Sequence, residues 1–433
     1  MSLLPASSSG EVSTGFYNNV IDQSARFDGS SSELNVTPSS TGNRRTFTTS
    51  LWIKRTTLAI FELHTGGSNS YNQQSTQFSI NSAHQLQFYD VLAGITNYAY
   101  VRSNEVLRDT TNWYHVVLAV DTTQSTASNR VRMYINGNEV SYVTGGLSQY
   151  PNQNHDTVRN NSGTVTRIAR FPNVGVNYYG GYIAEFNHID GTQLTPTSFG
   201  ETKNGVWIPK AISGLTYGTN GVRLTFADSS AIGDDTSGNG NDYTASGLAS
   251  TDIVSDSPEN NFATWNSLFK GGERSSSIYA ASTLSEGNLQ VSVPTNSYMG
   301  STFRPVSGKW YAEIRVKTIG STNGEIDWGW LQATTYSSNT GHNGQANKWG
   351  AFYHAYSTDH IRLYDETSQL GSNINLTISA GDILQLAWDI DNNKGWVGIN
   401  NTYYRTDASD GNPSAGTNET FTALLDRDFT VSI

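Results

Sequence analysis

Hydrophobic and polar residues alternate with a period of two in many short segments of this chain. In residues 46–54, Phe47, Leu51 and Ile53 fall on one face and Trp52 falls on the other. This alternation is typical of β-strands that bury one face in a core. We therefore expect a strand here, with its aliphatic side chains pointing inward.

A second strong pattern lies in the middle of the first half. The apolar run Asn112–Asp121 leads through a polar loop into Arg130–Ile135, which is followed by Asn136-Gly137 and then by Asn138–Val140. Asn-Gly between alternating runs predicts a β-hairpin, because both residues tolerate the positive φ of a type I′ turn. Further strands of this half are expected at residues 25–28, 33–36, 77–80, 85–89, 180–191 and 222–226.

Similar segments return after a loop-like stretch, at residues 287–293, 309–316, 326–331, 382–389 and 395–400. The chain is thus predicted to be all-β, with two tandem antiparallel β-sandwich (jelly-roll) domains. The expected boundaries are a polar N-terminal arm over 1–20, a sandwich over 21–230, a loop and linker over 231–275, and a second sandwich over 276–433.

Composition supports this class and excludes others. The chain has 433 residues with 41 Gly, 23 Tyr, 10 Trp and only 15% charged residues. A net charge of −11 argues against binding nucleic acid, and no apolar run is long enough to insert into a membrane. The chain has no Cys, and its N-terminus has no signal-peptide pattern, so we expect synthesis in a reducing cytoplasm.

Three segments of the first domain share one family's pattern: Phe47–Lys54, the Asn112–Asp121 strand with the Met133–Val140 hairpin, and Gly181–Phe186. The last matches a closing strand of the type G-x-I-x-E. Through these segments, residues 24–200 resemble the concanavalin A-like lectin/glucanase superfamily, in its laminin-G/pentraxin-like branch. The resemblance implies a lectin-like sandwich.

The second domain carries a different pattern. Residues 308–313 read GKWYAE, and Gly381–Asp389 followed by Ile399–Asn401 matches a GD…D…NG hairpin, with Asn401 where Gly is usual. Residues 285–433 therefore resemble a SPRY (B30.2-like) domain. Such domains normally continue beyond this point, so a final strand is either missing or supplied by another subunit through edge pairing.

The order of the two modules, with the start Met1–Ser7 and the segment Leu194–Glu201, resembles virion structural proteins of tailed phages, cyanophages of marine bacteria especially. The resemblance implies a virion surface protein, such as a tail fibre, spike or adhesin, that binds host-surface carbohydrate without catalysis. The alternative is a capsid decoration or cement protein with purely structural contacts. Other virion proteins are expected partners. The chain itself is expected to form a homo-oligomer, with a trimer favoured.

Aromatic residues in polar contexts are the candidate carbohydrate-binding residues, because sugar rings pack on Tyr and Trp while amides bind their hydroxyls. Two groups are expected to bind sugar. They are Tyr178 and Tyr179 in the first domain, and Trp349, Tyr353 and Tyr356 in the second. The competing interpretation of each Tyr is ordinary half-buried packing within a strand.

The candidate metal site is the polar segment 234–242. Asp235, Ser237 and Asn239 with Gly240 match the start of an EF-hand loop, whose alternating oxygen atoms bind calcium. The Glu expected at the twelfth position is Ser246. A plain polar turn is the competing interpretation, and no other cofactor is expected.

No catalytic residues are expected. Glucanases of this superfamily carry Glu-x-Asp-x-x-Glu on one strand, and the nearest match, Glu325-Ile326-Asp327, has Trp330 in place of the second Glu. The eight His residues are scattered, and His115 in the Trp113–Asp121 strand is expected to be structural.

Overall fold

In the computed structural model the chain folds into antiparallel β-sheets, which confirms the all-β prediction. The structure describes residues 2–5, 16–59, 61–67, 74–91, 98–145, 148–171, 177–268, 282–293, 299–319, 324–332, 348–354, 359–365, 368–406, 408–422 and 429–432. Within these ranges the helical segments are three short 3-10 turns: η1 (Ala127–Asn129), η2 (Pro196–Ser198) and η3 (Ser250–Asp252). No helix of the described chain is long and apolar enough to cross a membrane.

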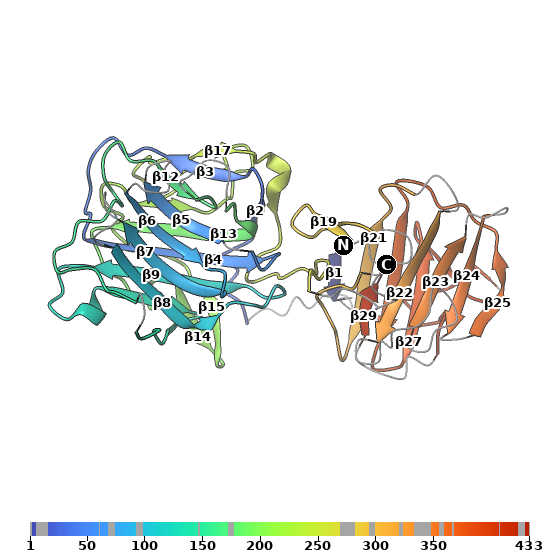
Figure 1. Ribbon diagram of the computed structural model, residues 1–433. Helices are drawn as coiled ribbons and strands as arrows, with labels where there is room; N and C mark the ends of the chain where they lie inside the picture. The colour runs from blue at the N-terminus through green and yellow to red at the C-terminus, as the bar shows by residue number, and fades with distance from the viewer. Residues whose placement is uncertain are drawn as a thin grey trace. The chain divides into compact units, whose positions relative to one another are not determined.

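The chain forms two compact units (Figure 1). The first unit comprises Ser13–Asn261. The second unit comprises Phe262–Ile433 together with Met1–Val12. Each unit contains its own hydrophobic cluster.

Two sheets make up most of the first unit. Sheet I has the order β11 (Asn138–Glu139), β10 (Val131–Ile135), β9 (Tyr114–Asp121), β4 (Thr46–Arg55), β13 (Gly180–Asp190), β2 (Ser24–Asp28) and β18 (Ile253–Val254), with β16 (Val222–Leu224) also paired to β13. Sheet II has the order β17 (Thr244–Ser246), β3 (Glu33–Val36), β12 (Thr166–Ile168), β5 (Phe61–Gly67), β6 (Ser75–Ile80), β7 (Gln85–Val91) and β8 (Tyr98–Val106). A separate hairpin joins β14 (Gly200–Lys203) to β15 (Val206–Pro209).

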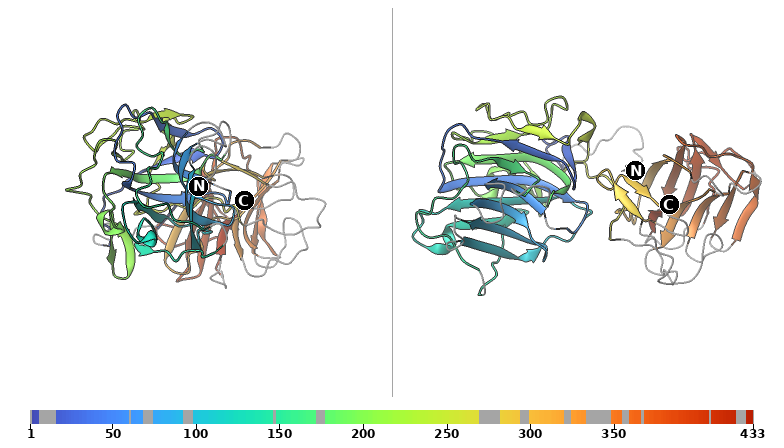
Figure 2. Two further views of the ribbon diagram at one scale, coloured as in Figure 1. Left: turned by 60° about the vertical axis from the view of Figure 1, so that its left-hand side comes forward. Right: turned by 45° about the horizontal axis from the view of Figure 1, so that its top comes forward.

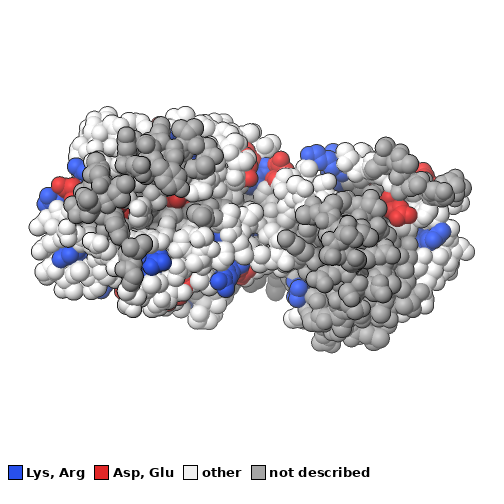
Figure 3. Space-filling view, viewed as in Figure 1, with Lys and Arg blue, Asp and Glu red and all other residues white. Residues whose placement is uncertain are grey.

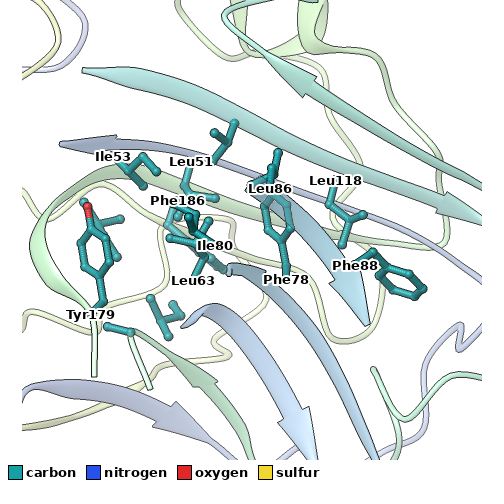
Figure 4. Close-up of a cluster of buried hydrophobic side chains, with 14 of the residues drawn as sticks. Leu51, Ile53, Leu63, Phe78, Ile80, Leu86, Phe88, Leu118, Tyr179 and Phe186 are labelled. Carbon is teal, nitrogen blue, oxygen red and sulfur yellow. The ribbon is translucent and has the colours of Figure 1, made fainter. Parts of the chain in front are cut away.

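The core of the first unit lies between sheets I and II (Figure 4). Leu51 and Ile53 of β4 are buried there together with Phe78 and Ile80 of β6, as the alternation in residues 46–54 predicts. Burying one such side chain contributes about 1.5–3 kcal/mol, so the inward residues of the strands fix which residues face outward.

The predicted hairpin around Asn136-Gly137 is confirmed. Strands β10 and β11 pair antiparallel around this turn, with Tyr134 opposite Glu139 and Ile135 opposite Asn138. Asn136 has φ +47° and Gly137 has φ +81°, the two positive values that a type I′ turn requires.

The second unit also contains two main sheets (Figure 2). Sheet III has the order β1 (Ser2–Pro5), β21 (Lys309–Arg315), β26 (Ile383–Asp389), β27 (Lys394–Ile399) and β28 (Thr402–Tyr404). Sheet IV has the order β25 (Ser368–Ile374), β24 (His360–Asp365), β23 (Lys348–His354), β22 (Glu325–Gln332) and β29 (Phe429–Ser432). A small hairpin joins β19 (Thr283–Ser285) to β20 (Gln290–Ser292).

The N-terminal segment differs from the expected polar arm. Strand β1 pairs antiparallel with β21, with Ser2 opposite Glu313 and Pro5 opposite Trp310. Figure 1 shows this dark blue strand beside the orange strands of the second unit. The Ser- and Gly-rich composition of residues 1–20 hides a four-residue segment that completes a sheet edge, which periodicity over so short a run cannot reveal.

The expected linker over 231–275 also differs from the structure. Strands β17 and β18 pair with β3 and β2, so residues up to Asn261 belong to the first unit. Glu259 holds this end of the unit in place, because its carboxylate accepts hydrogen bonds from the four backbone N–H groups of residues 18–21, at 2.7–3.0 Å. Polar turn residues suggested a free linker, but their side chains bind the sandwich instead.

Candidate functional site

The outer face of sheet II carries a row of polar side chains that crosses four strands. Pairing places Ser79 opposite both Glu62 and Gln87, and places Gln87 opposite Arg102. The row runs from β5 to β8, over three strand spacings or about 14 Å. Together with Tyr89 and Tyr100, these four residues are called the polar face below.

The core explains why these residues point outward. Phe78, Ile80, Leu86 and Phe88 of β6 and β7 lie in the buried cluster (Figure 4). Successive side chains of a strand point to opposite faces, so the residues between them belong to the outer face. The sequence of the two strands therefore builds the core and the polar face at the same time.

Glu62 is the most unusual group of the polar face. Its side chain is only 2% exposed, and its Oε2 atom has no hydrogen-bond partner among the described residues. Burial disfavours the charged form and raises the pKa of Glu62 to about 8. At neutral pH the group is therefore mainly a neutral carboxylic acid, which can both donate and accept a hydrogen bond.

The opposite end of the row is aromatic and cationic. The rings of Tyr89 and Tyr100 meet edge to face at 5.4 Å, and the guanidinium of Arg102 lies 4.6 Å from the Tyr100 ring centre. The Nε atom of Arg102 is buried and has no hydrogen-bond partner in the described chain. The ring fixes the orientation of the guanidinium and leaves hydrogen-bonding capacity unused.

Gln87 connects the two ends. Its amide Nε2 donates to Ser79 Oγ at 2.8 Å, whereas its Oε1 is buried without a hydrogen-bond partner within the described ranges. An unpartnered buried polar atom costs about 1–3 kcal/mol, so three of them on one face call for an explanation. The face offers donors, acceptors and tyrosine rings, the combination that hydroxyl-rich ligands bind.

Charged residues also lie further along the same outer face. Arg167 of β12 is opposite Thr65 of β5, and Glu33 of β3 contacts both Arg167 and Arg170, at 3.3 and 2.6 Å. The guanidinium of Arg170 lies 5.2 Å from the ring centre of Tyr178. Of the two tyrosines expected to bind sugar in this unit, Tyr178 is partly exposed.

The other expected sugar-binding aromatics are mostly buried. Tyr179 is fully buried, and its hydroxyl donates to the backbone oxygens of Lys54 and Tyr182. Trp349 and Tyr353 are each 2% exposed because both belong to β23 and to the core of the second unit. The expectation that these three rings are available at the surface is wrong: they serve packing. Tyr356 lies outside the described residues.

The expected calcium loop is a hydrogen-bonded turn. The carboxylate of Asp235 accepts four hydrogen bonds, from the backbone N–H groups of Arg223, Ser237 and Asn241 and from the Ser237 hydroxyl, each at 2.9 Å. The Asn239 amide donates to the carbonyls of Gly218 and Gly221. Among the described residues no group of three or more His, Asp or Glu is placed to hold a metal ion. Calcium binding stays a prediction.

The outer face of sheet I is closed by the chain itself. His115 lies between the rings of Trp52 and Trp207, at 4.7 and 5.8 Å, and Trp207 comes from the β14–β15 hairpin. The Trp207 indole N–H donates to His115 Nδ1 at 3.1 Å, so the ring proton is on Nε2, which donates to Ser50 Oγ at 2.8 Å. Burial lowers the pKa of His115 to about 3. These contacts match the expected structural role.

The buried ammonium group of Lys54, on the same face, also has hydrogen-bond partners within the chain. Its ammonium donates to Asp256 and to Asn261, both at 2.7 Å, and the Trp113 indole N–H donates to the other oxygen of Asp256 at 2.9 Å. Both charged groups are buried, but Lys54 has partners in residues 256–261 and the carboxylate of Asp256 has partners in Lys54 and Trp113. This face is filled by the protein's own chain.

Comparison with known proteins gives a family match for most of the first unit. Residues 28–196 match a laminin-G family model described as "Concanavalin A-like lectin/glucanases superfamily". A search of the curated proteins finds no match.

Three solved structures illustrate the similarity. A heptameric pentraxin from Limulus polyphemus is 16% identical over 41% of this chain and 79% of its own, with a TM-score of 0.31. Domains LG4-5 of the mouse laminin α1 chain are 11% identical over 99% of this chain and 86% of their own, with a TM-score of 0.30. The Ruminococcus gnavus sialidase domain CBM40 is 13% identical over 41% and 93%, with a TM-score of 0.30.

The family match and the two stacked antiparallel sheets agree with each other. The matched segment begins at the end of β2 and includes most strands of sheets I and II, with the closing strand β13. Residues 28–196 therefore have the concanavalin A-like, laminin-G-like jelly-roll fold.

Proposed function

We propose that this chain is a non-enzymatic carbohydrate-binding protein, and that its first unit binds a glycan on the polar face. The observation that carries the proposal is the row from Glu62 to Arg102, whose unpartnered polar atoms adjoin the Tyr89–Tyr100 pair. The lectin-type domain match and the chemistry of this face point to the same class of ligand.

The absence of catalysis is part of the proposal. Glycoside hydrolysis uses two carboxyl groups on either side of the scissile bond. The polar face carries one, Glu62, and the other members of the row carry a hydroxyl, an amide and a guanidinium. Incubating the protein with host polysaccharide should release no reducing ends, and release by wild type that Glu62→Gln abolishes would contradict this.

We also propose that the protein acts at a virion surface, as a tail fibre, spike or adhesin that binds host-surface carbohydrate. The support is the order of the two modules and the SPRY-like sequence of the second, which resemble phage structural proteins. Labelling particles with an antibody against the second unit tests the location. Absence of label from intact particles would overturn it.

A glycan array with the purified protein tests carbohydrate binding. We expect specific binding that Tyr100→Ala weakens, because the ring that orients Arg102 is lost. Tyr17→Ala is the matched control, since Tyr17 is an exposed tyrosine of the same unit, 39% exposed, outside sheet II. Silence across the array would instead favour the alternative, a decoration or cement protein with purely structural contacts.

A further inference from the structure

Charge on the outer face of sheet II differs in sign from that of the whole chain. The chain has a formal net charge of −11, and the charged residues visible in Figure 3 are scattered singly or in small groups. The outer face of sheet II carries three arginines, Arg102, Arg167 and Arg170, against the carboxyl groups of Glu33 and Glu62.

These groups are not evenly paired. Glu33 lies between Arg167 and Arg170 and forms an ion pair with both. Glu62 is mainly neutral at pH 7, because burial raises its pKa to about 8. Arg102 has no carboxylate partner among the described residues, so the polar face carries an uncompensated positive charge.

We propose that the ligand of the polar face is an anionic glycan, whose carboxylate or sulfate group binds the guanidinium of Arg102 while its hydroxyls bind Gln87. This inference rests on the proposed function and names its ligand class. An arginine presents its donors in a planar fork that matches the oxygens of a carboxylate or sulfate, and Tyr100 holds that fork in one orientation.

The positions of the residues on the polar face give each of them a different role in binding the ligand. Gln87 is opposite Arg102 on the neighbouring strand, so an anion at Arg102 brings adjacent hydroxyls next to the partly exposed side chain of Gln87. Tyr89 lies beside Tyr100 and provides apolar surface for a sugar ring. The carboxyl of Glu62, at the far end of the row, does not repel the ligand while it is neutral.

The test compares three oligosaccharides with the same backbone: one neutral, one carrying a uronic acid and one carrying a sulfate. We expect wild type to bind at least one acidic form about tenfold more tightly than the neutral form, since charge-assisted hydrogen bonds are the stronger ones. High salt should reduce this preference. The acidic form that binds more tightly identifies the anion.

Variants test whether the preference for the acidic oligosaccharide depends on Arg102. Arg102→Gln should abolish the preference for the acidic form, and Arg102→Lys should retain only part of it, because Lys keeps the charge and loses the fork. Arg132→Gln is the control, since Arg132 is a partly exposed arginine on sheet I, 39% exposed. Thermal melting of each variant establishes that it is folded.

The outcomes separate the two proposals. Equal binding of neutral and acidic forms by wild type, or an acidic preference that survives in both folded Arg102 variants, would overturn this inference and leave carbohydrate binding intact. Binding of no glycan by wild type would overturn both.

Discussion

The two sheets of the first unit both bury polar groups on their outer faces, but they do so differently. On sheet I, His115 and Lys54 are covered by Trp207 and by residues 256–261, and the covering segments supply their hydrogen bonds. On sheet II, Glu62, Gln87 and Arg102 retain buried atoms without partners in the described chain. On sheet I the covering segments thus supply hydrogen bonds to His115 and Lys54, whereas the polar face of sheet II keeps hydrogen-bonding capacity unused, and our proposal of a ligand there depends on this difference.

The largest effect on stability is expected when the counter-ion of a buried charged group is removed from the outer face of sheet I. Asp256→Ala leaves the buried ammonium of Lys54 without its counter-ion, and we expect the free energy of unfolding to fall by about 3–5 kcal/mol. Asp156→Ala is the control, because Arg45 and Asp156 are 43% and 47% exposed and their ion pair should contribute little to stability. Urea unfolding measures the free energy of unfolding of both variants. A loss in Asp256→Ala as small as that in Asp156→Ala would show that the contact between Lys54 and Asp256 is not structural.

Sheet II should show the opposite behaviour, because Glu62 weakens the fold when it ionises. The pKa of Glu62 is about 8 in the folded protein against 4.5 for the free group, so its contribution to stability is fully present below pH 4.5 and is lost as the pH rises towards 8. Glu62→Gln should therefore be more stable than wild type at pH 8, by roughly 4 kcal/mol. Urea unfolding at pH 5 and pH 8 measures the difference, and a variant that is less stable at both values would contradict it.

His115 gives the opposite pH dependence. Its pKa falls from 6.5 to about 3 on folding, so its contribution is present above pH 6.5 and is lost as the pH falls. His115→Gln keeps one donor and one acceptor for Ser50 and Trp207. It should reduce the loss of stability between pH 6.5 and pH 5 by about 2 kcal/mol.

His64 and His188 are also buried with lowered pKa values, so part of this slope should remain in the His115→Gln variant. An unchanged slope would mean that His115 is not held neutral. The comparison is sharpest when Glu62→Gln and His115→Gln are measured over the same pH series, because the two variants should remove slopes of opposite sign.

The smallest effect is expected at the Asp235 turn, where the oxygens are already occupied. Adding calcium or a chelator should leave the melting temperature unchanged, because four donors fill the carboxylate that calcium would need. Thermal melting with and without calcium checks this. A rise that Asp235→Asn abolishes would show that the turn rearranges into a metal site.

Local alternation was sufficient to predict much of this fold. Strand β4 and the β10–β11 hairpin follow from side chains that repeat every second residue and from the turn chemistry of Asn136-Gly137. The extents of the units did not follow, because Glu259 and Asp256 stabilise the fold through contacts with residues far away in the sequence.

The candidate site was harder to predict. A bulge between Glu62 and His64 interrupts the period of two where the key carboxyl lies, so its outward direction cannot be inferred from the sequence. Arg102 joins the row only through the pairing of β7 with β8. The alternation of Gln85, Gln87 and Tyr89 with Leu86 and Phe88 was the available signal, since it predicts a polar outer face.

Residues adjacent in the sequence can also differ in their exposure to solvent. Tyr178 is partly exposed beside Arg170, while Tyr179 is fully buried, because adjacent side chains of extended backbone point to opposite sides. Composition gives the number of tyrosines, but the direction of each ring depends on the backbone.

The pairing of β1 with β21 has a consequence for how the protein is made. Ser2–Pro5 leaves the ribosome before the first unit, whereas its partner strand Lys309–Arg315 is synthesised only after that unit. Folding of the second unit thus joins segments synthesised before and after the first unit. A fragment that starts at Phe262 would expose the unpaired edge of β21 to other chains.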